Sequence, residues 1–578
     1  MPPRHQTEIV ARVSEVLEGS RAAQAAGDSK ALSRLRDEGA QLMLQLAPLV
    51  EEGDVRAAEM LFELAYLNMQ YQLVSGNWMT ATGACTLLSG AVAAITHGIT
   101  YGKYEDPQSR LFDLMGKMRN VAEVAACAAH QSGVLMNAIM CLEVQTGILF
   151  DMLMTKTSGR VVQLHADADL INIPELAEHA RQQTEPWRSE PLSTGPGTLQ
   201  RGAESAALTS LSTPAQDDPF EQFYFTPHYA HAVQAARMTG RTLLYVVPGF
   251  WKYDGVAIRV NADDATGNLM ESTWLPDLQT SEVNAQLEQL RAAFQQSDRP
   301  RERSVSVQQI LDWTGRHVWE PISARWPDMM SRPLAVVPVS RAALLPLYTA
   351  TLCGQPACTV VDMTVAPSAR ALHFAALGKT EPAASNAYVA ADAWHGHHHT
   401  LEFAHAEANA IAAVYGIEPV LYSTDEAVAS TPNPSAAQRL RTATVAHLAC
   451  HGRLDNTHQA LLLGGIVSLD RLLAANDDVL PGRPVVVLSA CDLGGTAGEN
   501  ISAEQYGFPA GLLAVGARSV VGALWPLLDA ESTIRVMESF HRQLAIRPSQ
   551  AALPAAITEA RRAQISPLIW GSLVHFGA

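Results

Sequence analysis

Beyond residue 240, short runs of β-branched and other apolar residues alternate with segments of helical spacing. Runs that are apolar throughout, such as residues 485–488, are typical of central parallel strands covered on both faces. This alternation predicts an α/β fold in which a mostly parallel sheet is flanked by helices. In such sheets functional side chains gather at the carboxyl ends of the strands. The runs are TLLYVVPG, GVAIRV, LAVVPV, CTVVDMTV, ATVAHLAC, VVVLSAC and SVVGALW.

The part of the chain before this region has a different pattern. It contains few prolines, and apolar residues recur at helical spacing, as at Ala57 and Leu61. We expect an all-α domain over residues 1–185, with roughly five to seven helices, for sensing, docking or oligomerisation. No 34-residue self-similarity of the tetratricopeptide kind is found. Residues 186–224, rich in Pro, Ser, Thr and Gly, are predicted to be a flexible linker to a second domain over residues 225–578.

Length, composition and charge exclude several classes of protein. With 578 residues the chain exceeds a single small domain, and its 48% apolar and 17% charged residues indicate extensive buried surface. A net charge of −17 repels phosphate groups and anionic lipids, which argues against direct nucleic-acid binding. Seven scattered cysteines without a CxxC pair indicate neither a disulfide framework nor a cysteine zinc site. Since the start of the chain lacks an apolar run of the signal-peptide kind, we expect a cytoplasmic protein.

One stretch, from Leu64 to Gly102, has no Asp, Glu, Lys or Arg over 39 residues. It carries Asn, Gln, Thr, Ser and His throughout, whereas a membrane span is more uniformly apolar. We therefore predict buried helix and no membrane span. A helical domain of this size normally exposes polar faces at regular intervals. The run therefore also predicts contact with another surface, such as an activator or a second copy of the chain.

Two predicted strands end in reactive side chains. Residues 444–450 run into His451 and Gly452, and residues 485–490 run into Cys491. A connection of about forty residues lets two parallel strands lie side by side. An imidazole and a thiol would then meet at one edge of the sheet, as a general base and a nucleophile do.

These residue types suit acyl transfer. A thiol ionises near neutrality, and a neighbouring imidazole can deprotonate it and later protonate the leaving amine. Gly452 has no Cβ, so its backbone N–H can approach a substrate carbonyl and form an oxyanion hole with the N–H of Cys491. Taken singly, His451 or Cys491 would more often be an ordinary residue at a strand end.

The same strand ends carry a resemblance to a known family. VAHLACHG followed by VVVLSACDLG resembles the His-Gly and Ser-Ala-Cys motifs of the CHAT family of caspase-like cysteine peptidases, in clan CD. The resemblance extends over residues 225–578 through AEQYGFPAGLLAVGARSVVGALWPLLDAEST, ARRAQISPLIWGSLVHFGA, LAVVPVSRAALLPLYTA and TVAPSARAL. Leu527 replaces the usual valine, and Val339, Ser340 and Arg341 depart from the family's Asp-Gly type of turn. The N-terminal helical domain gains no assignment from it.

The resemblance implies a caspase-like peptidase domain with an upstream half, 225–380, and a catalytic half, 381–578. It implies that Cys491 is the nucleophile, that His451 is the general base and then acid, and that the substrate is a polypeptide. The candidates for lining the S1 pocket are Ser489, Glu499, Asn500, Trp525 and Asp529.

The implied function is that of a cysteine endopeptidase in bacterial defence or regulated cell death. Its substrate would be a companion effector protein, and the helical domain would control the peptidase activity. The acidic S1 candidates suggest a basic P1 residue, with Asp529 as first choice and Glu499 as second. Asp529 could instead cap a helix that begins near Ala530. The alternative function is a catalytically silent caspase-like scaffold or interaction protein.

His447 is a rival general base because it shares strand parity with His451. It lies inside the strand, however, so we interpret it as structural, and Cys450 as a core residue.

A histidine-rich segment looks like a metal cluster. Because it is local and supplies no dispersed second set of ligands, we interpret it as a solvated loop and expect no metal. No phosphate-binding loop with its lysine occurs, so no cofactor is expected. The residues of this segment are Asp392, His395, His397, His398 and His399.

Overall fold

The computed structural model of the chain divides by its internal contacts into two compact units, and each is described by itself. The helical unit has Met1–Ile148 as its main segment, and the sheet unit has Ala232–Asp263 and Ser272–Ala578. The described residues are 3–51, 54–74, 76–100, 107–158, 228–262, 269–296, 299–377, 386–393, 400–422, 434–454, 459–468, 480, 482–490 and 507–578.

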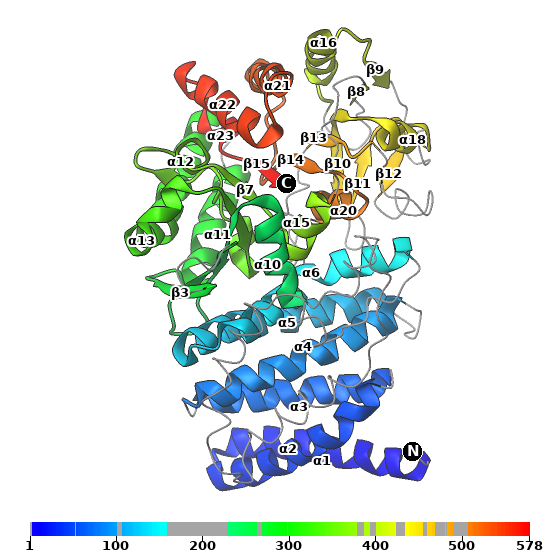
Figure 1. The fold of residues 1–578 in the computed structure, drawn as a ribbon, viewed down its shortest axis with the longest axis vertical. Helices are drawn as coiled ribbons and strands as arrows, with labels where there is room; N and C mark the ends of the chain where they lie inside the picture. Colours follow the sequence, from blue (N-terminus) through cyan, green and yellow to red (C-terminus); the bar gives the residue numbers. More distant parts are fainter. Residues whose placement is uncertain are drawn as a thin grey trace. The chain divides into compact units, whose positions relative to one another are not determined.

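Six long helices make up the described part of the N-terminal region (Figure 1). They contain 20 to 26 residues each, and consecutive helices from α1 to α5 pack against one another. The expected helical region before the sheet is confirmed. The helices are α1 (Pro3–Ala26), α2 (Ser29–Glu51), α3 (Val55–Val74), α4 (Trp78–Thr100), α5 (Pro107–Ser132) and α6 (Leu135–Ser158).

Glycine turns join these helices in pairs. Gly27, Gly76 and Gly133 have positive φ angles of 69°, 72° and 77°, a conformation that suits a residue without a Cβ. They lie between α1 and α2, between α3 and α4, and between α5 and α6. The three glycines are 49 and 57 positions apart, so the repeating element is a helical hairpin of about fifty residues. A search at the 34-residue tetratricopeptide period could not detect it.

The uncharged run from Leu64 to Gly102 covers the end of α3 and all of α4. α4 packs against α3 and α5, and its apolar residues, such as Leu88 and Val92, are buried. Cover by two neighbouring helices of the same unit accounts for the missing charges without an interface to another chain. Among the described helices, none has both the length and the apolar character needed to cross a bilayer.

The sheet unit is built on one mixed sheet, in which the described residues form thirteen strands. Its main path runs in the order β12-β11-β10-β13-β14-β15-β7-β4-β1-β2-β3, and β8 and β9 branch from β10. The strands are β1 (Thr242–Val247), β2 (Gly255–Val260), β3 (Met270–Leu275), β4 (Leu334–Pro338), β7 (Met363–Val365), β8 (Ala387–Asp392), β9 (Val420–Tyr422), β10 (Val445–Leu454), β11 (Gln459–Leu462), β12 (Ile466–Ser468), β13 (Val485–Ala490), β14 (Ser519–Ala523) and β15 (Leu573–Gly577). A separate pair joins β5 (Thr351–Leu352) and β6 (Gln355–Pro356).

Two parallel blocks of opposite direction make up this sheet. β9, β8, β10, β13 and β14 are mutually parallel, and so are β15, β7, β4 and β1. The blocks meet where β14 pairs antiparallel with β15. β2, β11 and β12 add antiparallel pairs. The predicted mostly parallel sheet is confirmed, and the antiparallel junction is an addition to it.

Helices flank the sheet, and apolar strand residues such as Val485, Val486 and Val487 are fully buried. α16 packs on β8 and β10, and α21 packs against both α16 and α22. The helices of this unit are α10 (His228–Thr239), α11 (Thr280–Gln296), α12 (Pro300–Thr314), the π-helix η2 (Gly315–Trp319), α13 (Glu320–Arg325), the 3₁₀ helices η3 (Pro327–Ser331) and η4 (Ser340–Leu344), α14 (Ala357–Val360), α15 (Ala369–Ala376), α16 (Ala404–Tyr415), α18 (Pro434–Thr442), α20 (Gly507–Ala514), α21 (Glu531–Leu544), α22 (Ser549–Arg562) and α23 (Pro567–Trp570).

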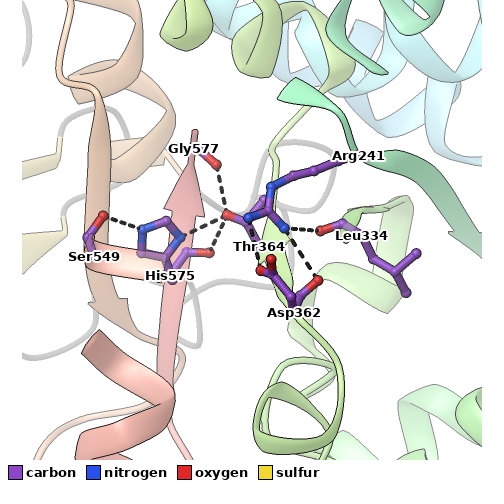
Figure 2. Close-up of polar contacts among 7 residues, drawn as sticks. All are labelled: Arg241, Leu334, Asp362, Thr364, Ser549, His575 and Gly577. Atoms are coloured by element: carbon purple, nitrogen blue, oxygen red, sulfur yellow. Dashed lines mark hydrogen bonds and ion pairs between the residues drawn. The ribbon is translucent and has the colours of Figure 1, made fainter. Parts of the chain in front are cut away.

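A buried chain of hydrogen bonds closes the seam between β7 and β15 (Figure 2). The Thr364 hydroxyl donates to the carbonyl oxygen of Gly577 at 2.8 Å and lies 2.8 Å from Nδ1 of His575. On the other side of the ring, Nε2 of His575 lies 2.9 Å from Oγ of Ser549, which lies 3.0 Å from Oγ of Ser519. An uncharged imidazole that donates to Thr364 and accepts from Ser549 satisfies every contact.

Charge and burial around this chain favour the uncharged ring. Burial in the first place, and the nearby guanidinium groups of Arg241 and Arg518 in addition, lower the pKa of His575 to about 3. Arg241 pairs with the Asp362 carboxylate at 2.9 Å and donates to the backbone carbonyl of Leu334 at 3.1 Å (Figure 2). It thereby ties together the starts of β1, β4 and β7.

Candidate active site

The backbone register places the two sequence motifs side by side. β10 and β13 are adjacent and parallel, and Cα partners run in step from Val445↔Val485 to Cys450↔Ala490. His451 directly follows one member of the last pair, and Cys491 directly follows the other in the sequence. Cys491 itself lies outside the described residues. The candidate base and nucleophile thus come immediately after paired residues at the carboxyl ends of neighbouring strands.

β10 changes its neighbour at His451. Up to Ala449, which pairs with Ala391, β10 has β8 as its second parallel partner. From His451 onward it pairs antiparallel with β11, where His451 is opposite Leu462 and Gly452 is opposite Leu461. His451 is buried, with 8% of its surface exposed, and Gly452 is half-buried. The candidate general base therefore lies at a junction of three strands.

His447 is fully buried and belongs to a relay of polar side chains. Its Nδ1 lies 3.0 Å from Nε2 of His541 on α21, and its Nε2 lies 3.0 Å from Oε1 of Glu407 on α16. The latter contact has the distance of an ion pair but not the angles of a hydrogen bond. Nδ1 of His541 lies 2.8 Å from the hydroxyl of Tyr415.

One arrangement of protons fits this relay. Tyr415 donates to His541, His541 donates to His447, and the remaining N–H of His447 lies beside the Glu407 carboxylate. Burial lowers the pKa of His541 well below its usual value, and the neighbouring His447 adds to this effect. The relay attaches α16 and α21 to β10. It supports the structural interpretation of His447, and Cys450 is likewise buried.

The candidate S1 residues occupy different environments. Ser489 lies in β13 with 8% of its surface exposed. Trp525 is 1% exposed, and its Nε1 donates to the carbonyl oxygen of Leu568 at 3.0 Å. Its ring is buried and hydrogen-bonded to α23, and the assignment of Trp525 to the S1 pocket stays a prediction. Glu499 and Asn500 lie outside the described residues.

Asp529 caps a helix other than the expected one. The N-cap of α21 is Ala530, and no side chain caps that helix. Oδ1 of Asp529 instead accepts the backbone N–H of Phe403 at 3.0 Å, at the start of α16. Partial burial raises the pKa of Asp529, while the N–H groups of Phe403 and Glu402 oppose that shift. The carboxylate thus links the loop after β14 to α16.

No set of three or more potential ligands for a metal ion occurs among the described residues. The side chain of Asp392, the first member of the suspected cluster, accepts the backbone N–H of Gly464. The histidines at 395 and 397–399 lie outside the described residues.

Sequence reasoning missed Glu407, Tyr415 and His541, which complete the relay around His447. Glu407 leaves a trace in the sequence, because it interrupts the apolar face of α16 that includes Ala408 and Ile411. An acid at such a buried position requires a polar partner. No local pattern identifies that partner as His447.

Comparison with known proteins finds a matching family for part of the sheet unit. Residues 308–578 match the family model of the CHAT domain. Fifteen chains of solved structures are similar, among them one in the crystal structure of the Saccharomyces cerevisiae separase–securin complex. That similarity has a TM-score of 0.41 and 9% sequence identity, covers 97% of this chain and spans 49% of the other. No curated protein sequence matches the chain. Residues 308–578, just under half of the chain, are therefore similar to the CHAT domain family.

Proposed function

We propose that this protein is a cysteine endopeptidase that uses Cys491 as nucleophile and His451 as general base and acid. The observation that supports this most directly is the register of β10 and β13, in which Cys450 pairs with Ala490. The residues that follow this pair are the imidazole and the thiol that acyl transfer requires. The CHAT domain provides the family context.

The proposed reaction has two halves. The imidazole of His451 takes the proton of the Cys491 thiol, and the thiolate attacks the scissile carbonyl carbon. The backbone N–H groups of Gly452 and Cys491 stabilise the tetrahedral oxyanion. The imidazolium protonates the leaving amine as the C–N bond breaks, which leaves a thioester. Water, deprotonated by the imidazole, then hydrolyses the thioester, and the thiol is regenerated.

The proposed substrate is a protein, in the first place a companion effector, in bacterial defence or regulated cell death. We further propose control by the N-terminal helical region, because an unregulated endopeptidase would damage its host. Ser489 and the acidic Glu499 and Asp529 remain candidates for the S1 pocket and a basic P1 residue. Since Asp529 already accepts the N–H of Phe403, Glu499 becomes the first choice.

The second candidate function is a catalytically silent scaffold. The deep burial of His451, which is 8% exposed, favours it, because a general base must reach the substrate. The two functions differ in the reactivity of one thiol. Cys353 provides an internal reference, because it is exposed and lies at the turn between β5 and β6.

A peptide chloromethyl ketone distinguishes an enzyme from a scaffold. We expect it to alkylate Cys491 at least about tenfold faster than Cys353, because a paired imidazole raises the thiolate fraction and substrate contacts position the probe. Peptide mapping by mass spectrometry measures both sites in one sample. Labelling of Cys353 without Cys491 would support the scaffold.

Removal of the helical region tests the proposed control. If that region restrains the site, residues 225–578 label Cys491 faster than the full chain does. If it recruits the substrate, the fragment labels equally fast but cleaves the companion protein more slowly. Identical rates and identical substrates for the two forms would rule out both kinds of control.

A further inference from the structure

The carboxyl end of β8 holds a buried carboxylate beside the candidate base. Asp392 is the last residue of β8 and has 1% of its surface exposed. β8 accompanies β10 as far as the pair Ala391↔Ala449, so Asp392 lies level with Cys450, one residue before His451. A carboxylate so deeply buried is costly unless N–H groups or positive charges compensate it.

The compensation comes from the turn that follows β11. Oδ2 of Asp392 accepts the backbone N–H of Gly464 at 2.6 Å, a short, charge-assisted hydrogen bond. Gly464 and Gly465 have φ angles of 62° and 135°, and Leu463 donates to the carbonyl oxygen of Gly465 at 2.8 Å. Only glycine adopts such a pair of conformations without strain, so the turn has a defined shape that presents the N–H to the carboxylate.

This hydrogen bond lies where β10 exchanges one neighbouring strand, β8, for another, β11. β8 ends at Asp392, and β11 takes over with the pair His451↔Leu462. The turn at Gly464 begins two residues after Leu462. Asp392 therefore links the carboxyl end of β8 to the carboxyl end of β11. Without this attachment, the segment opposite His451 would be held only by its strand pairing with β10 and β12 and would lose its link to β8.

We infer that Asp392 is a positioning residue, which fixes the strand end opposite His451 and thereby the direction of its imidazole. This inference rests on the proposed function. Displacement of a catalytic group by about 1 Å typically costs on the order of a hundredfold in rate. Loss of the carboxylate should therefore weaken the coupling between the imidazole and the Cys491 thiol.

The pH dependence of Cys491 alkylation by iodoacetamide measures this coupling in the full chain without a known substrate. In the wild-type protein we expect substantial alkylation below pH 7, because the imidazole lowers the pKa of the thiol. In Asp392→Ala we expect the midpoint of the alkylation–pH profile to move toward the ordinary thiol pKa of about 8.5. The alkylation rate of Cys491 at pH 6.5 should be roughly 10- to 100-fold lower than in the wild-type protein. Asp392→Asn keeps an oxygen that can accept the Gly464 N–H and should restore most of the rate.

Asp254→Ala is the matched control. The Asp254 carboxylate accepts the backbone N–H of Asp277 at 3.1 Å in a loop after β1, so its loss removes a comparable bond elsewhere in the sheet unit. We expect it to leave the alkylation profile unchanged. If Asp392→Ala does not fold, Asp392→Val provides the same deletion with a residue that favours strands.

The outcomes separate the two proposals. If His451→Ala leaves the alkylation profile at the wild-type position, no dyad exists, and both the proposed function and the role of Asp392 are overturned. If His451→Ala shifts the profile and the folded Asp392 deletion does not, the dyad is retained and the inference about Asp392 fails. An equal shift in Asp254→Ala would also overturn it, because the effect would then reflect general destabilisation.

Discussion

Replacement of Cys491 by alanine should abolish peptide-bond cleavage, with kcat/KM reduced by at least about 10⁴-fold. The variant lacks the protein atom that, in the proposed mechanism, forms a covalent bond with the carbonyl carbon of the substrate. His451→Ala should cost a similar factor, because nucleophile and base act as one unit. Cleavage of a fluorogenic peptide library, with product N-termini identified by mass spectrometry, provides the measurement.

Two other cysteines are controls for this result. Cys450 is buried in β10 directly before His451, and Cys353 is exposed at a distant turn. Cys353→Ala should retain wild-type activity, and Cys450→Ala should lose activity only as far as it loses stability. Residual cleavage by Cys491→Ala above that of a buffer control would disprove the assigned nucleophile. Loss of activity in Cys353→Ala would point to a different reactive thiol.

Acid should destabilise the sheet unit before the pH falls to the range in which carboxylates titrate. Three buried histidines are held neutral in the folded chain. Burial lowers the pKa of His373 and of His575 to about 3, with Arg370 assisting at the first and Arg241 at the second. Burial also lowers the pKa of His541 well below its usual value.

The direction of the effect follows from proton uptake. In the unfolded chain these imidazoles regain a pKa of about 6.5, so below that pH the unfolded state binds more protons than the folded state. The stabilisation is complete above about pH 6.5 and is lost progressively as the pH falls toward 3. Each group contributes about 1.4 kcal/mol per pH unit once the pH is well below 6.5, and about half of that on average between pH 7.5 and 5.5. Three groups therefore remove about 4 kcal/mol of unfolding free energy between about pH 7.5 and 5.5, a large share of the 5–15 kcal/mol typical of folded proteins.

Urea unfolding at several pH values measures this slope. Tryptophan fluorescence reports on the sheet unit, where Trp319, Trp326 and Trp525 are buried. We expect these three histidines to take up nearly three protons in total on unfolding near pH 5.5. In His541→Gln the uptake should be smaller by about one proton. Exchange of a solvent-exposed residue, such as Arg299→Gln, should leave the slope unchanged. An uptake below one proton would show that the buried rings are already charged in the folded state.

The sequence predicted the sheet well because its central strands are continuous apolar runs. Val485, Val486 and Val487 could be assigned to a covered strand from composition alone, and they are fully buried. The antiparallel junction of β14 and β15 was not predicted, because an apolar run carries no information about strand direction. The helical hairpins were missed because their period is set by the glycine turns and not by a motif of aromatic residues.

In the site, too, features that depend on neighbouring residues in the sequence were predicted, and features that depend on distant residues were not. The register of β10 and β13 agrees with a prediction from two local motifs, which need only the end of each strand. Trp525 and Asp529 could not be placed, because their partners Leu568 and Phe403 are 43 and 126 positions away in the sequence. Proximity to the nucleophile strand in the sequence does not reveal these hydrogen-bond partners.

Ser340 accounts for one departure from the family pattern. It is 1% exposed and has a φ of 54°, which lies in the left-handed region where glycine is favoured. The chain thus has at this position a backbone conformation that glycine adopts without strain and that serine rarely adopts.

The opposed blocks of the sheet have a consequence for how such a chain can diversify. Because β14 and β15 run in opposite directions, the carboxyl ends of β1 and β4 lie at the edge away from those of β10 and β13. That far edge carries the loop with Trp251, which is 65% exposed and has a φ of 58°. We expect insertions and substitutions in its loops to leave the edge with the proposed dyad unchanged. New binding preferences could then arise on one edge of the sheet independently of the proposed site on the other.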